Sequence, residues 1–129
     1  MTLDQRELVL TGGRTQVVFT AGDGAPLVWL HGINGPQAEE DWIQRLAQQH
    51  TVYAPLAPGF ADLDELRDLR DIHDLALHYD DTLDSLDIQS AIVAGSSFGA
   101  MIAAEYAAHY PKRIEQLVVH VEQVFGGFA

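Results

Sequence analysis

The most constraining feature of this 129-residue sequence is the stretch from residue 88 to residue 110. It contains a short apolar run at residues 91–94, which is typical of a buried strand. The pentapeptide Gly95-Ser96-Ser97-Phe98-Gly99 follows. An alanine-rich segment, apolar on almost every side, comes next and predicts a buried helix. A G-x-S-x-G motif between a strand and a helix predicts a sharp turn with Ser97 at its centre.

The predicted turn gives Ser97 a chemical role. Such a turn forces the central serine into a strained backbone conformation, and the flanking glycines leave room for neighbouring backbone. The serine oxygen is then exposed at a helix N-terminus, where unpaired N–H groups can hold an anion. The alternative interpretation is a glycine-rich turn without chemistry. The strand and the helix on either side favour Ser97 as a nucleophile.

The remainder of the chain alternates strands with helices. Two β-rich runs at residues 6–11 and 14–20 are joined by Gly12-Gly13, which predicts a hairpin. Further strands are predicted at residues 27–30, 51–56 and 114–121, and further helices at residues 37–49 and 72–86, with a charged, irregular segment at 61–70. This alternation implies a parallel sheet with right-handed crossovers. Asp71 and Asp74 resemble a capping box at the start of the second of these helices.

Composition bounds the class of protein. The length predicts one domain over residues 1–129, and the absence of cysteine excludes disulfides, thiol catalysis and thiolate metal sites. A net charge of −12 argues against nucleic-acid and anionic-membrane partners, which need clustered lysine and arginine. The sequence has no run of about 18 apolar residues and no apolar N-terminal leader, so a cytoplasmic location is expected.

Several motifs together resemble one known family. They are the hairpin, Leu30-His31-Gly32, Ala54-Pro55 through Pro58-Gly59-Phe60, Gly95-Ser96-Ser97-Phe98-Gly99, and Tyr110-Pro111-Lys112-Arg113-Ile114. In this order the chain, up to about residue 119, resembles the N-terminal half of an α/β-hydrolase-fold serine hydrolase. The resemblance implies an α/β fold. It would be a three-layer half α/β-hydrolase sheet, in which an N-terminal β-hairpin precedes parallel strands with crossover helices.

The resemblance also implies roles for particular residues. Ser97 would be the nucleophile, and the backbone N–H groups of Phe98 and Ile33 would form the oxyanion hole. His31 would shape its loop rather than act as a base. No cofactor and no resident metal are expected, and the substrate would be a small molecule with an ester-like carbonyl.

One departure from the family concerns the catalytic acid and base. The family fold has eight strands, with the acid usually after the seventh and the histidine after the eighth, whereas this sequence is interpreted as truncated after the sixth. A serine without a base is a weak nucleophile. Some members of the family place the acid at the end of the sixth strand, where Val121 is the closest match and Glu122 the nearest carboxylate. An ordinary solvated glutamate is the alternative.

Histidines could supply a base or a ligand. His120 stands where the family has an aliphatic residue and shares a strand face with Glu122, so it is a candidate base or metal ligand; a satisfied strand histidine is the alternative. His73 and His78 diverge by about 140° on a helix and cannot face one ion. His78 shares a face with Asp74, which is interpreted as an exposed i,i+4 pair. His50 and His109 suit helix ends.

The end of the predicted sheet bears on assembly. If no seventh strand follows, Leu117-Val118-Val119 forms an exposed apolar edge, which is a template for pairing with another chain. A homodimer is therefore expected, either through the sixth strand or by exchange of C-terminal segments. Such a dimer could also place a histidine of one chain near Ser97 of the other.

Three hypotheses for function follow. The first is an ester hydrolase with a Ser97 nucleophile, completed in the homodimer. The second is a metal-assisted hydrolase at the dimer seam, to which His120 and Glu122 could contribute ligands. The third is a catalytically incomplete or engineered half-domain that only dimerises.

Overall fold

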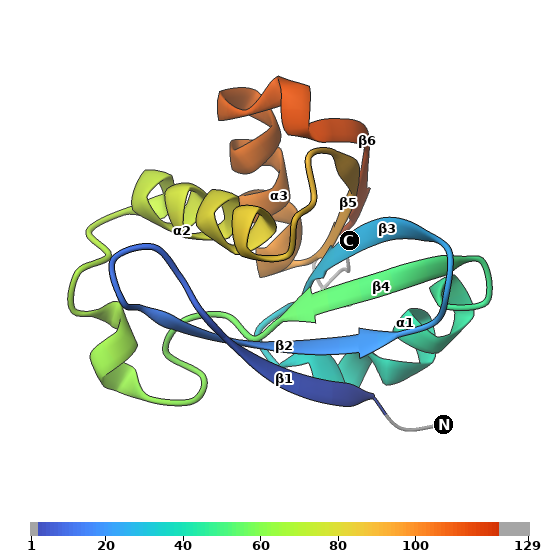
Figure 1. The fold of residues 1–129 in the computed structure, drawn as a ribbon, viewed down its shortest axis with the longest axis horizontal. Helices are drawn as coiled ribbons and strands as arrows, with labels where there is room; N and C mark the ends of the chain where they lie inside the picture. The colour runs from blue at the N-terminus through green and yellow to red at the C-terminus, as the bar shows by residue number, and fades with distance from the viewer. Residues whose placement is uncertain (1–2, 122–129) are drawn as a thin grey trace, which may run out of the picture.

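A computed structural model of the protein describes residues 3–121 (Figure 1). Its strands are β1 (Asp4–Val9), β2 (Thr15–Ala21), β3 (Ala25–Leu30), β4 (His50–Pro55), β5 (Ala91–Ser96) and β6 (Ile114–His120). Its helices are α1 (Glu40–Leu46), α2 (Ile72–Ser85) and α3 (Phe98–His109), with short 3₁₀ segments η1 (Pro36–Glu39), η2 (Leu63–Leu66) and η3 (Pro111–Arg113). No helix within residues 3–121 is long and apolar enough to cross a lipid bilayer.

The six strands form one sheet in the order β1-β2-β4-β3-β5-β6. The hairpin strands β1 and β2 run antiparallel to each other, and β2 is antiparallel to β4, whereas β4, β3, β5 and β6 are mutually parallel. The predicted hairpin is confirmed. Gly12 and Gly13 have φ angles of 91° and 89°, which glycine adopts without a steric penalty. The connection is closed by a hydrogen bond from the N–H of Leu10 to the carbonyl of Arg14.

The sheet is covered on both faces, which confirms the predicted three-layer α/β architecture. In Figure 1, α2 and α3 lie together on one face and α1 lies on the other. Strand β3 shows why both layers are needed, because Val28 and Leu30 pack under α2 and α3 while Leu27 and Trp29 pack toward α1. Such a strand reads as a continuous apolar run, as the sequence predicted.

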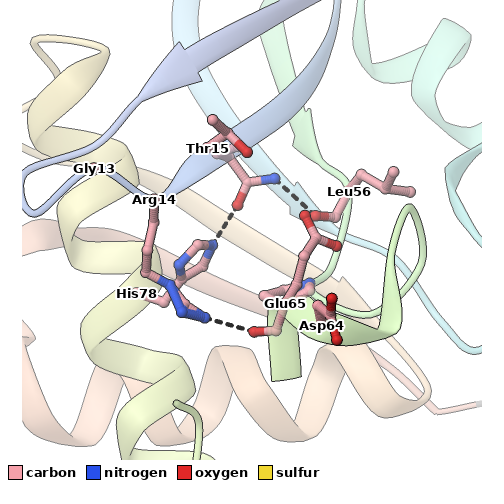
Figure 2. Close-up of a pocket in the computed structure, with 9 residues that line it drawn as sticks. Gly13, Arg14, Thr15, Leu56, Asp64, Glu65 and His78 are labelled. Carbon is pink, nitrogen blue, oxygen red and sulfur yellow. Dashed lines mark hydrogen bonds between the residues drawn. The ribbon is translucent and has the colours of Figure 1, made fainter. Parts of the chain in front are cut away.

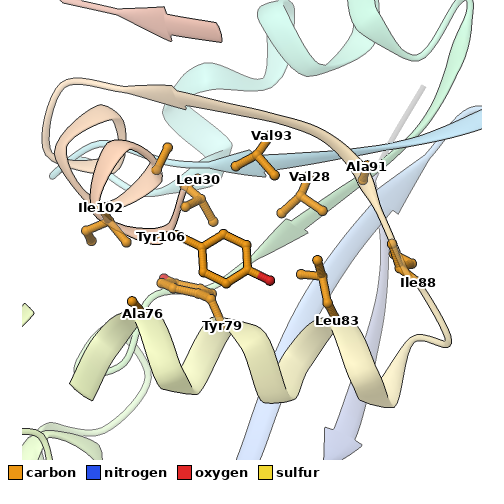
Figure 3. Close-up of a cluster of buried hydrophobic side chains, with 11 residues drawn as sticks. Val28, Leu30, Ala76, Tyr79, Leu83, Ile88, Ala91, Val93, Ile102 and Tyr106 are labelled. Carbon is orange, nitrogen blue, oxygen red and sulfur yellow. The ribbon is translucent and has the colours of Figure 1, made fainter. Parts of the chain in front are cut away.

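The core under α2 and α3 contains the larger aromatic side chains. Figure 3 shows Tyr79 of α2 and Tyr106 of α3 between the two helices and the strands that carry Val28 and Val93. Both tyrosines are at most 2% exposed. Their burial fixes α3, and with it the turn at the start of α3, against the sheet.

The first predicted helix differs from the observed one. The sequence predicted a continuous helix over residues 37–49, but the structure has η1 and then a short α1 that ends at Leu46. Ile43 and Ala47 of this segment are buried, whereas Trp42 is 48% exposed. The α-helix starts late because Gly35, with a φ of 86°, turns the chain before Pro36, and a 3₁₀ segment then precedes the α-helical residues.

The charged segment at residues 61–70 is more regular than predicted. It contains η2, whose start is a complete capping box: Asp62 accepts the N–H of Asp64 at 3.0 Å, and Glu65 accepts the N–H of Asp62 at 3.3 Å. At α2, the predicted box is half formed. Asp71 caps the helix, but the carboxylate of Asp74 binds the backbone N–H and the side chain of Arg70 instead.

Candidate active site

Ser97 lies at the junction of β5 and α3 and has an unusual backbone conformation. Its φ is 57° and its ψ is −116°. Among the non-glycine residues of 3–121, Ser97 and Asp87 are the two with positive φ. A residue with a side chain rarely adopts such angles, and strain of this kind persists where the surrounding structure imposes it. The predicted sharp turn is therefore present.

The two glycines of the motif explain how this turn can form. A Cβ atom at Gly95 would overlap the backbone of Gly99, and a Cβ atom at Gly99 would overlap the carbonyl group of Leu30. The first turn of α3 can thus pack directly against the ends of β5 and β3. This close approach brings the start of the helix next to the loop that follows β3.

That loop is held from one side by His31. The ring Nδ1–H donates to the carbonyl of Gly32 at 2.7 Å, and Nε2 accepts the N–H of Ala57 at 2.8 Å. Since a backbone N–H can only donate, Nε2 must be the unprotonated nitrogen. Burial lowers the pKa of His31 from its ordinary value, so the neutral ring is favoured. Both nitrogens are occupied, and His31 ties the loop to the chain after β4.

Glu39 also holds this loop, although no sequence motif marks it as a functional residue. Its Oε1 accepts the indole N–H of Trp29 at 2.8 Å, and its Oε2 accepts the N–H of Gly32 at 3.0 Å. A Cβ atom placed on Gly32 would lie 2.9 Å from Oε2 of Glu39 and 3.4 Å from Cβ of Ser97. The carboxylate, the loop and the serine are therefore immediate neighbours.

Two backbone N–H groups flank this arrangement. Ile33 follows Gly32 in the loop and is 75% exposed, and no backbone hydrogen bond among residues 3–121 uses its N–H. Phe98 is the first residue of α3, where an N–H group lacks a partner within the helix. The N–H of Ser97 itself donates to the carbonyl of His120 at 2.9 Å.

His120 lies beside the turn but contacts another side chain. It is paired in register with Ser96, and its ring centroid lies 5.3 Å from that of Trp42 in α1. Glu122 lies outside the described residues, and Val121 is 80% exposed. The structure thus places His120 next to the backbone of the turn at Ser97, with its ring against that of Trp42.

Within residues 3–121, no histidine side chain is hydrogen-bonded to Ser97. His50 contacts the carbonyl of Leu46, His78 contacts Gln16, His73 and His109 contact each other, and His109 also approaches Glu105. In the same part of the chain, no group of three or more histidine, aspartate or glutamate side chains is placed to hold a metal ion.

A separate pocket of about 280 Å³ lies between the hairpin, η2 and α2 (Figure 2). His78 lines it and is 5% exposed, so the prediction of an exposed pair with Asp74 was wrong for His78. This face of α2 turns toward β2, where the ring binds the side-chain oxygen of Gln16.

The bonds of Gln16 define the tautomer of His78. The Gln16 amide nitrogen donates to the carbonyls of Val17 and Leu56, each at 2.7 Å. Its oxygen must therefore accept, and Nε2 of His78 carries the proton, while the buried Nδ1 has no partner within the described residues. Burial and then the positive charge of Arg14 lower the pKa of His78 to about 4.

The fold and the turn at Ser97 define a class of protein. Residues 25–122 match the family described as the alpha/beta hydrolase fold, and the chain belongs to that family. The predicted family and fold class are thereby confirmed.

Particular relatives narrow the comparison. A protein of Mycobacterium phage D29, provisionally named a non-heme haloperoxidase, is 37% identical over 114 residues, which are 87% of this chain and 41% of that protein. The 2-hydroxymuconate semialdehyde hydrolase of Pseudomonas sp. strain CF600 is 34% identical over 119 residues, covering 88% of this chain and 42% of the relative. This chain thus spans about two fifths of the length of these relatives.

A solved structure agrees with the fold. The crystal structure of a membrane phospholipase A, described as a bacterial virulence factor, matches with a TM-score of 0.83 and 21% sequence identity. The match covers 95% of this chain and 41% of that one. At this level of identity it bears on the fold alone.

Proposed function

We propose that the protein is a hydrolase of small ester-like substrates in which Ser97 is the nucleophile. The observation that carries the proposal is the positive φ of Ser97, held between β5 and the N-terminus of α3. Membership of the alpha/beta hydrolase family and a hydrolase among the relatives support hydrolysis as the type of reaction.

In the proposed reaction, the Ser97 oxygen attacks the carbonyl carbon of the substrate. The carbonyl oxygen becomes an anion, which the N–H groups of Ile33 and Phe98 stabilise, and such donors are often the largest catalytic contribution. The serine proton must pass to a base, because the hydroxyl is hardly ionised near neutral pH. Glu39 and His31 hold the loop that presents Ile33.

The proposed base is His120, or a histidine of a second copy of the chain, with Glu122 as the orienting acid. In the structure described here the His120 ring lies against Trp42, so a role as base requires the ring to turn toward Ser97. If no histidine reaches Ser97, the alternative is a catalytically incomplete half-domain. The second alternative, a metal-assisted reaction at the dimer seam, has less support, since no group of three or more metal-binding side chains occurs within residues 3–121.

The proposal includes a homodimer through β6, or by exchange of C-terminal segments, which lie beyond the described residues. Strand β6 is at the edge of the sheet, and six of its seven residues are exposed. Leu117, Val118 and Val119 are 39%, 44% and 48% exposed. An apolar strand with an unpaired edge readily pairs with another chain.

A covalent label tests the nucleophile. A fluorophosphonate should modify Ser97, and Ser97→Ala should abolish both the labelling and the hydrolysis of nitrophenyl esters, because the attacking oxygen is gone. Ser96→Ala is the matched control: Ser96 is the adjacent serine but is 6% exposed in β5, so this variant should keep the label.

Two outcomes would reject the proposal. Ester hydrolysis that survives Ser97→Ala would mean that other chemistry is responsible. If the dimeric protein is neither labelled nor active with the substrates in excess, the catalytically incomplete half-domain is the function that remains.

A further inference from the structure

An apolar pocket adjoins the turn at Ser97, and we call it the Phe98 pocket. Its volume is about 280 Å³, and nine of its eleven lining residues are apolar. They come from three parts of the chain: the loop after β4, the segment from η2 into α2, and the first turns of α3. Concave apolar pockets of this kind are typical of sites for small molecules.

The Phe98 pocket adjoins the proposed catalytic residues through Phe98. The side chain of Phe98 lines the pocket, and its backbone N–H follows directly after Ser97. Phe60 also lines the pocket, and the centroid of its ring lies 4.7 Å from that of His31, edge to face. Phe60 also lies 3.9 Å from the point where a Cβ atom on Gly35 would stand. Phe60 thus links the pocket to the loop that carries Ile33.

Large apolar side chains of this pocket remain exposed. Phe60, Leu66, Phe98 and Met101 are 42%, 46%, 41% and 52% exposed. Single exposed apolar residues are ordinary, but several that converge on one hollow mark a binding surface. Their gathering next to Ser97 favours the apolar part of a substrate as the occupant.

The charges around the pocket restrict what it can hold. Among the described residues, Arg70 is the single basic residue that lines the pocket, and its Nε and Nη2 lie 3.0 Å and 3.4 Å from the carboxylate of Asp74. Asp71 also lines the pocket. A carboxylate at the end of a bound acyl chain would meet no unpaired cation among the described residues. It would also exchange water for apolar walls and lie close to Asp71 and Asp74.

We propose that the Phe98 pocket binds the uncharged alkyl part of the acyl group that Ser97 attacks. This inference rests on the proposed function and adds a substrate class: neutral esters with acyl chains of medium length, in preference to short acyl groups and to chains that end in a carboxylate. The Ser97 oxygen bonds to the acyl carbon, the alcohol leaves with the serine proton, and water then releases the acid and restores the hydroxyl.

Matched nitrophenyl esters test the preference. The kcat/KM for p-nitrophenyl octanoate should exceed that for the acetate, and that for the mono-p-nitrophenyl ester of octanedioic acid, by about tenfold or more, because burial of the alkyl chain favours the first alone. Equal values for the octanoate and its charged twin would overturn the charge selectivity. Equal values for octanoate and acetate would overturn the role of the pocket.

A pair of variants links the preference to the pocket. Met101→Lys places a cation on the pocket wall and should raise the ratio of charged to neutral ester by about tenfold, since an ion pair replaces an uncompensated carboxylate. Leu77→Lys is the control, because Leu77 is a comparably exposed apolar residue of α2 that does not line the pocket. An equal change in both variants would indicate a general charge effect and would overturn the assignment.

Binding can be measured without turnover. The sequence contains two methionines, Met1 and Met101, so methyl-labelled Ser97→Ala protein reports on the pocket through one NMR signal of known identity. Methyl octanoate should shift the Met101 signal, whereas its twin with a terminal carboxylate should not; a signal unmoved by both overturns the pocket. If methyl octanoate shifts the Met101 signal but the fluorophosphonate never labels Ser97 in the wild type, the proposed function is rejected and the pocket assignment stands.

Discussion

Ser97 has a φ of 57°, and its neighbours make that angle necessary. Gly95 and Gly99 cannot carry a side chain without overlapping nearby backbone, so the chain can turn from β5 into α3 in few ways. The strain is therefore imposed by the packing of the helix on the sheet. At this scale the fold and the proposed chemistry are properties of the same few residues.

A carboxylate supports this arrangement, and its removal is testable. Glu39→Gln replaces one of the two oxygens that accept the N–H groups of Trp29 and Gly32, so the loop that carries Ile33 should loosen. The rate of fluorophosphonate labelling at Ser97 should fall by about tenfold, because hydrogen bonds to a charged group contribute roughly 1.5–3 kcal/mol. The indole N–H resonance of Trp29 should move in the same variant.

The control for this prediction is Glu40→Gln, which removes the same charge one residue further along. Glu40 begins α1 and makes neither of the two hydrogen bonds. Labelling that is unchanged in Glu39→Gln, although the Trp29 resonance has moved, would show that the carboxylate is structural and has no influence on Ser97.

His78 should make stability depend on pH. Its pKa is lowered to about 4 in the folded chain, against 6.5 for an ordinary histidine, so the unfolded chain binds the extra proton first. The stability that the neutral His78 contributes to the folded chain is present above pH 6.5. It is lost as the pH falls toward 4, and the total loss is about 3 kcal/mol of unfolding free energy. Urea unfolding at pH 7 and at pH 4.5 should show this loss in the wild type.

Two variants distinguish the effect of His78 on stability from that of carboxylates, which also titrate in the acidic range. His78→Gln keeps a donor for Gln16 but cannot take up a proton, so the fall in unfolding free energy should be smaller than in the wild type. His73→Gln changes an exposed histidine of the same helix and should leave the fall unchanged. The same pH dependence in all three proteins would contradict the assignment to His78.

The sequence predicted the residues whose partners lie close along the chain. The turn at Ser97 is formed by a contiguous motif, so its position could be predicted from the sequence alone. The partners of His78 and Glu39 could not be read in this way. Gln16 is 62 positions away from His78, and Glu39 reaches back across a turn to Trp29, ten positions earlier. A carboxylate at a helix start is too common for its position alone to mark it.

Among the elements, β6 differs from the other parallel strands. Strand β5 is buried along almost its whole length, whereas β6 is exposed on both faces and pairs with β5 alone among the described strands. An apolar edge strand of this kind exposes apolar side chains to water and also leaves the N–H and C=O groups along its outer edge unpaired.

The proposed pairing through β6 can be measured directly. Light scattering at micromolar concentration should give twice the chain mass of 14.2 kDa. Val119→Lys should weaken the association by about tenfold or more, because a charge at an apolar strand edge opposes pairing. Val9→Lys is the matched control, since Val9 is 71% exposed on β1 at the other edge of the sheet.

A wild-type mass equal to one chain would reject the dimer. Equal weakening by both lysine variants would show that copies associate through some other surface.

The boundaries of the strands were predicted within two residues, because runs of strand-forming residues bounded by turn residues mark where a strand begins and ends. The helix predicted over residues 37–49 shows where this fails. Apolar spacing reports which residues face the core, and Ile43 and Ala47 do, but it does not report where helical hydrogen bonding begins. The box of Asp62 and Glu65 was missed for a related reason, since a one-turn segment has no periodicity to detect.

At the scale of the molecule, two cores lie on opposite faces of one sheet. The order of strands and helices was enough to predict this, because alternating elements have few ways to bury both faces. The selectivity of the site was not predictable from the sequence. The Phe98 pocket draws its walls from three separated segments, and the pairing of Arg70 with Asp74 emerges from the folded chain.

The two borders of this sheet are chemically unlike. The outer border of β1 carries Asp4, Arg6 and Glu7, all exposed, whereas the outer border of β6 carries neighbouring leucine and valine side chains. When two copies have paired through their apolar β6 edges, each copy has only its charged β1 edge left, and this edge does not favour pairing with a third copy. Under the proposed pairing, growth therefore terminates at a closed pair, and the polymerisation into fibres that a bare apolar strand otherwise invites is blocked.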